Sequence, residues 1–325
     1  MIETKCSQGK VAPLIGISAA SSWAWGTSLI MGMEVCQEKG IWAFAIWAAA
    51  NTLTLAVFGF LMNRGIIKPR IFDNRIVKGI ALLIQMLVLI MQLNIINDIL
   101  GDFIPSGIAT YAITSLIGIG MVWFMFRRGL PVSVSMDIGK YVIAILSIVA
   151  ILGIALLAPA GRVAFPETGA SEYMWAAWSA CVLFSGLIGD VQHWQRALAD
   201  ETRRSYYWGS LFFGIYMVGI FLMAHFEFNA AMNAVLLVAC LVITGSVINA
   251  IAVAMHETRD RRFGALVTVA VCLLWGLGVG VGLIAMWSSF GIIRVAFAVL
   301  IVVGSLMMKG VAKDARLEVA CEEQR

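Results

Sequence analysis

The chain has 325 residues, of which 61% are hydrophobic and only 13% are charged, and its formal net charge is +4. Soluble domains carry about 25% charged residues, so this composition excludes an ordinary soluble enzyme or nucleic-acid-binding domain. Apolar runs of about 20 residues recur along the chain, and each is long enough to cross a bilayer as a helix. The sequence therefore predicts an all-α polytopic membrane protein.

Ten apolar segments follow one another with short connections. They cover residues 13–34, 40–62, 76–97, 107–126, 134–158, 174–190, 206–226, 229–255, 263–286 and 289–309. With the N-terminus in the cytoplasm, all of the 23 lysines and arginines except Lys39, Arg162 and Arg294 fall in cytoplasmic loops or tails. This asymmetry follows the positive-inside rule. It predicts ten spans in a cell (inner or plasma) membrane, with short cytoplasmic tails at 1–12 and 310–325.

The polar connection at 159–173 divides the segments into two groups of five, 13–158 and 174–309. Because five is odd, the second group enters the membrane from the opposite side and has inverted topology. Inverted-repeat transporters are organised in this way, and their binding sites are formed by helices that are broken near the bilayer midplane. We therefore expect a single transmembrane domain, residues 1–325, built as a five-plus-five inverted repeat.

The first segment contains an unusual stretch, Ser18-Ala-Ala-Ser-Ser-Trp-Ala-Trp-Gly-Thr-Ser28. Small residues spaced four apart are typical of a face that packs against another helix. The alternative is a helix that opens at the midplane and offers backbone groups to a solute and an ion. The sixth segment has its own interruption at Ser185-Gly186. Two interruptions at corresponding places favour broken first and sixth helices.

Few side chains elsewhere could bind a polar solute. Gln85 and Gln92 share one face of the third segment, and Ser246 and Asn249 share a stripe of the eighth. Such groups can equally bridge helices to one another, and the tryptophans of the first segment can equally fill the core. The candidate solute-binding residues are Ser21, Ser22, Trp23, Trp25, Gln85, Gln92, Ser185, Gly186 and Asn249.

No ionisable residue lies at the predicted midplane of a segment. Asp137 and Asp190 lie at inner ends, and Arg294, near the start of the tenth segment, can snorkel to the interface. Because a strongly charged solute would need a buried partner, this placement predicts a neutral or zwitterionic solute. Three scattered histidines and no catalytic or phosphate-binding motif give no support to an enzyme.

Three patterns between residues 23 and 196 coincide. They are residues 23–29 (Trp-Ala-Trp-Gly-Thr-Ser-Leu) with 40–44 (Gly-Ile-Trp-Ala-Phe), 129–137 (Gly-Leu-Pro-Val-Ser-Val-Ser-Met-Asp) and 190–196 (Asp-Val-Gln-His-Trp-Gln-Arg). Together they resemble the sodium:solute symporter family, particularly branches that include urea-type active transporters. The resemblance implies a shortened, ten-helix member with a leucine-transporter-type fold. It further implies symport by alternating access, with a small solute and the lipid bilayer as partners and no nucleic acid.

The resemblance also implies a sodium site where carbonyls of the broken first helix meet adjacent hydroxyls of the eighth. With the register anchored on Glu257, the hydroxyl positions fall on Ile251 and Ala252, which cannot bind a hard cation. Sodium is the default coupling ion, and the alternatives are proton coupling, no coupling, or a transporter-like sensor acting with a separate partner. No other cofactor or metal is expected. The candidate ion-binding or ion-release residues are Ala20, Trp23, Thr244, Ser246, Asp137 and Asp190.

Overall fold

The structure is a computed structural model that describes residues 8–322, apart from 69–70, 73, 127–129, 158–160, 200–203, 258–260 and 279–282. The described chain is almost wholly helical, and its β pairing is confined to one isolated bridge between Arg162 and Phe226. Seven of the described helices are long and apolar enough to cross a membrane, or eight when one bent pair is counted as a single span. The predicted multi-pass, all-α architecture is confirmed.

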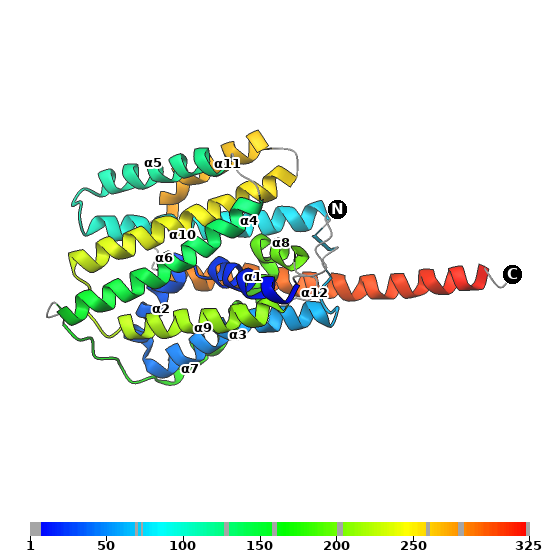
Figure 1. Cartoon of the computed structure of the whole chain (residues 1–325), viewed down its shortest axis with the longest axis horizontal. Coiled ribbons are helices and arrows are strands. Elements are labelled where there is room, and N and C mark those ends of the chain that lie inside the picture. The colour runs from blue at the N-terminus through cyan, green and yellow to red at the C-terminus, as the bar shows by residue number, and fades with distance from the viewer. Residues whose placement is uncertain are drawn as a thin grey trace.

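The helices follow the predicted apolar segments (Figure 1). Two of them, α7 with 17 residues and α11 with 14, are shorter than the ~20 residues that cross a bilayer. The elements are α1 Gln8–Trp23, α2 Gly26–Lys39, α3 Ile41–Asn63, α4 Arg75–Gly101, α5 Gly107–Met125, α6 Leu130–Leu157, α7 Ala170–Gly186, η2 Leu187–Gly189, α8 Val191–Ala199, α9 Ser205–Met223, α10 Ala230–Glu257, α11 Arg261–Leu274, η3 Trp275–Gly278 and α12 Leu283–Glu322.

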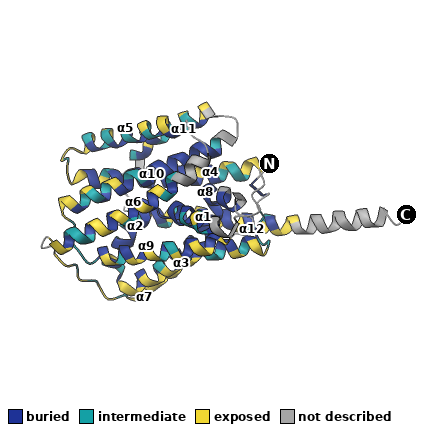
Figure 2. Cartoon of the chain, in the orientation of Figure 1, coloured by how far each residue is buried: buried dark blue, intermediate teal, exposed yellow. Residues whose placement is uncertain are grey.

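The helices pack side by side around α1 and α2 (Figure 1). Buried residues gather at this centre and exposed ones on the periphery (Figure 2). The peripheral side chains are themselves apolar, as in Ile108 and Leu157, which are 85% and 90% exposed. Such a surface suits hydrocarbon, because within a bilayer the backbone must be satisfied inside helices and apolar side chains can face lipid.

The first predicted span is two helices rather than one. α1 ends at Trp23, α2 begins at Gly26, and their axes differ by 64°. The Gly26 N–H leaves the helical ladder and donates instead to Oε1 of Gln92 on α4, at 3.1 Å. A Cβ at this glycine would lie 2.6 Å from that oxygen, so a larger residue here would displace the Gln92 amide. The interruption predicted within residues 18–28 is therefore present.

The sixth predicted span is also interrupted. α7 ends at Gly186, tightens into η2, and the chain becomes extended at Asp190 before α8. The Asp190 carboxylate accepts a 2.8 Å hydrogen bond from the Gln192 N–H and so caps the start of α8. The Trp194 indole donates to the Ile188 carbonyl at 2.8 Å, which satisfies part of the turn. The predicted position of the break, Ser185-Gly186, is wrong, because both residues are helical and the chain becomes extended only at Asp190, the predicted end of the span.

One predicted boundary near the C-terminus is wrong. The ninth segment was expected to reach residue 286, but α11 ends at Leu274 and the chain turns through η3 before α12 begins at Leu283. The stretch is apolar throughout, so hydropathy does not mark the turn. α12 continues to Glu322, and its apolar, span-length part ends at Met308, close to the predicted end of the tenth segment at 309.

Candidate functional site

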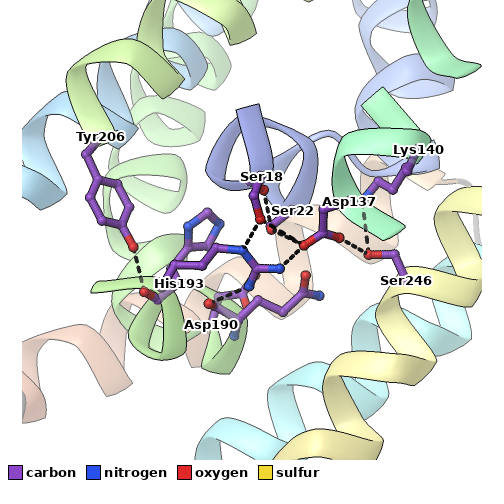
Figure 3. Close-up of polar contacts among 10 residues, drawn as sticks. Ser18, Ser22, Asp137, Lys140, Asp190, His193, Tyr206 and Ser246 are labelled. Atoms are coloured by element: carbon purple, nitrogen blue, oxygen red, sulfur yellow. Dashed lines mark hydrogen bonds and ion pairs between the residues drawn. The ribbon is translucent and has the colours of Figure 1, made fainter. Parts of the chain in front are cut away.

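A buried polar cluster joins α1, α6, α8 and α10 (Figure 3). Asp137 of α6 lies at its centre and forms an ion pair with Arg196 of α8, and both side chains are 1% exposed. The other carboxylate oxygen, Oδ1, accepts a 2.7 Å hydrogen bond from Ser246 of α10. We call this group the Asp137 cluster. Its members are Ser18, Ser22, Asp137, Lys140, Arg196 and Ser246.

The hydroxyls of α1 point at this ion pair (Figure 3). Ser18 donates to Asp137 Oδ2 at 3.1 Å, and its Oγ accepts from Arg196 Nε at 2.9 Å. Ser22 donates to the Ser18 carbonyl at 2.6 Å and lies 3.4 Å from the same Asp137 oxygen. The small-residue spacing of α1 therefore does more than permit close packing, because two of its hydroxyls bind the charges of α6 and α8.

Two cations of the cluster were expected in loops, and that expectation is wrong. Arg196 and Lys140 lie within helices and are each 1% exposed. Arg196 also donates to the Gln192 carbonyl at 2.6 Å, and Lys140 donates to Ser246 Oγ at 3.4 Å. Buried charges are tolerated when they are paired and hydrogen-bonded, and every member of the Asp137 cluster has a partner inside the chain.

A second polar site lies at the break between α1 and α2. Arg294 of α12 is 3% exposed, and its Cζ lies 4.8 Å from the centre of the Trp25 ring. The prediction that this arginine snorkels to the interface is wrong. α12 begins at Leu283, which places Arg294 about three turns inside the helix.

This site, the Arg294 pocket, lies between α2, α3, α7 and α12, and its side chains leave a cavity of only about 10 Å³, room for about one water molecule. The Trp23 indole donates to Asn51 Oδ1 at 3.0 Å, which orients the Asn51 amide. The lining residues are Trp23, Trp25, Thr27, Ser28, Met31, Trp47, Asn51, Leu183, Trp287 and Arg294.

The two sites collect only part of the predicted residue set. Ser22, Asp137 and Ser246 belong to the Asp137 cluster, whereas Trp23 and Trp25 line the Arg294 pocket. Gly186 joins the two interruptions, because a Cβ there would lie 2.5 Å from Trp23 Cη2.

Other predicted residues serve their own helices or bridge neighbouring ones. Ser185 and Thr244 donate to carbonyls one turn earlier, at 2.7 and 2.8 Å. Gln92 binds Gly26 and also donates to Thr27 at 3.4 Å, so it bridges α4 to α2.

Three more candidates, Ser21, Gln85 and Asn249, are buried, and each has at least one side-chain polar atom without a partner in the described chain. Asp190, a predicted release residue, is buried at the start of α8, where one of its oxygens caps that helix.

The carbonyls expected to bind an ion already accept hydrogen bonds. The Ala20 carbonyl accepts from the Ala24 N–H at 2.8 Å, and the Trp23 carbonyl accepts from the Trp25 N–H at 3.0 Å. Their geometry is that of a helix end closing on itself.

Sequence reasoning missed the residues that form the polar sites with the predicted ones: Ser18, Trp47, Asn51, Lys140, Arg196 and Arg294. A signal existed for Arg196, which ends the 190–196 pattern. None existed for Arg294, because its depth depends on the unmarked turn before α12.

Comparison of the chain with models of known protein families gives no match, and comparison with curated proteins gives none either.

Proposed function

We propose that this protein is a secondary transporter that moves a small polar organic solute by alternating access. The observation that supports it best is the contact between the two interrupted segments, where Gly186 of α7 packs directly on Trp23 at the break of α1. Transporters place broken helices together at the midplane because their exposed ends bind substrates and ions. The same contact is what the resemblance to sodium:solute symporters implies.

In this proposal α1–α2 and α7–η2–α8 are the first and sixth helices of a five-plus-five inverted repeat. The short α7 and α11, extended by the 3₁₀ turns that follow them, complete ten spans. The distribution of lysine and arginine supports a cell membrane with both termini in the cytoplasm.

The solute binds in the Arg294 pocket, on the α2 side of the break. The Asp137 cluster lies on the α1 side and ties four helices together. Opening a path along α1 requires these helices to separate, so the cluster acts as a latch that exchanges its partners during the cycle. A latch of buried charges suits this task, since water entering an open path would solvate the separated ions.

The latch also bears on ion coupling. Lys140 and Arg196 both lie beside Ser246 or Asp137, and their positive charges oppose a sodium ion there. A coupling cation therefore binds Asp137 only when the ion pair is broken. Sodium is the ion that the resemblance favours, and a proton is the alternative for the same carboxylate.

Uptake into proteoliposomes tests the proposal. Purified protein is reconstituted and offered labelled small solutes under an inward sodium gradient, an inward proton gradient, or neither. Accumulation under one gradient, abolished when that gradient is dissipated, is the expected result. Protein-free vesicles are the control, and the absence of uptake of every solute under both gradients would contradict the proposal.

A further inference from the structure

Arg294 has no acceptor within the described chain. Its guanidinium forms no ion pair and no hydrogen bond with a described residue, and its close contact is the face of Trp25. Asp190 acts on it electrostatically, but from beyond ion-pairing distance. An arginine presents five N–H donors in a planar fork that matches a carboxylate. A buried guanidinium without an acceptor is therefore a candidate binding site for a carboxylate.

The neighbouring polar groups are donors as well. The Trp25 Nε1, Trp47 Nε1 and Asn51 Nδ2 atoms are all buried and without a partner in the described chain. Asn51 presents its NH₂ group because its oxygen is already taken by Trp23. All three residues line the same cavity as Arg294. A buried donor that stays unpaired is costly, so these donors favour a ligand rich in acceptor oxygens.

The buried ionic side chains also leave an excess of positive charge. Among the described residues, the fully buried ionic side chains include three cations, Lys140, Arg196 and Arg294, but only two carboxylates, Asp137 and Asp190. One excess positive charge remains among these five groups, and one bound anion would balance the buried interior.

The walls of the pocket indicate what bears that anion. Tryptophan rings, with Met31 and Leu183, enclose most of the cavity, and no Asp or Glu is among its lining residues. Aromatic walls favour an organic body over an inorganic ion. Because no carboxylate lines the pocket, an ammonium group on the ligand would have no counter-ion there. The cavity is only about 10 Å³ in this structure, so an organic ligand enters it only when the surrounding side chains move apart, as they would in the proposed transport cycle.

We propose that the Arg294 pocket binds the carboxylate of a small organic acid that carries no other charged group. This inference rests on the proposed transport function and names its substrate class. It replaces the expected neutral or zwitterionic solute, because that expectation assumed that Arg294 reached the interface. The guanidinium and the indole and amide N–H groups hold the carboxylate, and the tryptophan rings hold the organic body.

Matched pairs of acids and amides provide the test. The purified full-length protein is titrated with benzoate against benzamide and with propionate against propionamide, with alanine, chloride and phosphate as further probes. A ligand stabilises the folded state by mass action, so thermal shift ranks the probes and calorimetry gives dissociation constants. We expect at least one acid to bind about tenfold or more tightly than its amide, and inorganic anions to have little effect.

Substitutions then assign the effect to the pocket. Arg294→Gln is expected to weaken acid binding by about tenfold to a hundredfold, and Arg294→Lys by less, because lysine keeps the charge but loses the fork. Trp25→Phe keeps an aromatic wall and removes one donor, so its loss is smaller still. Arg75→Gln, at an exposed position at the start of α4, is the matched control and leaves affinity unchanged.

The outcomes distinguish failure of the proposed carboxylate site from failure of the proposed transport function. The inference is overturned if neither acid binds the wild type, if each amide binds as well as its acid, or if folded Arg294→Gln and Arg294→Lys both retain wild-type affinity. Acid binding that requires Arg294, without uptake into proteoliposomes, would contradict transport and leave the site intact. Uptake of a neutral solute that is unaffected by Arg294→Gln would contradict the site and leave transport intact.

Discussion

The protein buries two arginines almost equally, yet in opposite circumstances. Arg196 contacts a carboxylate, a hydroxyl and a backbone carbonyl of the chain itself. Arg294 contacts one tryptophan face and lies beside further unpaired donors. A buried charge that is neutralised internally holds helices together, whereas one that is not neutralised is a place for a ligand. Burial alone thus does not distinguish a structural charge from a functional one, but the set of partners does.

The largest expected effect is the loss of one partner of the Asp137 cluster. Asp137→Asn or Arg196→Gln leaves the other charge buried and unpaired, which costs about 3–5 kcal/mol of folding free energy. The double variant removes both charges and should recover much of that loss. Thermal unfolding of the purified proteins measures it. Single variants no less stable than the double would show that the ion pair does not hold the helices.

The second-largest expected loss of stability comes from the contact between the two interrupted segments. In Gly186→Ala, the new Cβ would lie 2.5 Å from the Trp23 ring, whose indole N–H is held by Asn51. Such overpacking costs about 1–3 kcal/mol. Gly153→Ala on α6 is the control, since no atom lies within 4 Å of its Cβ position. Equal melting temperatures for the two variants would mean that the interruptions do not press on each other.

Two glutamines on one face of α4 sharpen the difference between partnered and unpartnered groups. Gln92→Met removes the acceptor of the Gly26 N–H and should cost about 1–2 kcal/mol. Gln85→Met removes an amide whose two polar atoms have no partner in the described chain, so stability should be unchanged or higher. The same unfolding assay compares them, and the reverse order would refute the assigned roles.

The smallest effect has the opposite sign to the first. Arg294→Met removes a charge that has no ion-pair partner in the described chain, and it also loses a cation–π contact with Trp25. We expect the ligand-free protein to stay within about 1 kcal/mol of wild type, or to be more stable. Arg196→Met, the same substitution in the Asp137 cluster, should be strongly destabilising. If both variants lose equal stability, the comparison between the two arginines fails.

The candidate sites were only partly within reach of sequence reasoning. The sequence indicates Asp137 and Ser246 separately, one from the family-like pattern and one from a polar stripe of the eighth segment. Their 2.7 Å contact depends on how α6 and α10 are rotated and offset, which no spacing within one helix encodes. Arg196 was named only as the end of a motif, and its pairing with Asp137 follows from the turn that redirects α8.

The sequence by itself determined the membrane class, most helix positions and the interruption near Gly26, because length, apolarity and local backbone demands are properties of the chain. Tertiary structure decided which charges are buried and which are paired. The clearest case is Arg294. A turn hidden in a continuously apolar stretch moves the start of α12 to Leu283 and carries the arginine from the interface to the break beside Trp25. Hydropathy averages over such a turn, whereas the depth of a charge depends on every residue between it and the helix start.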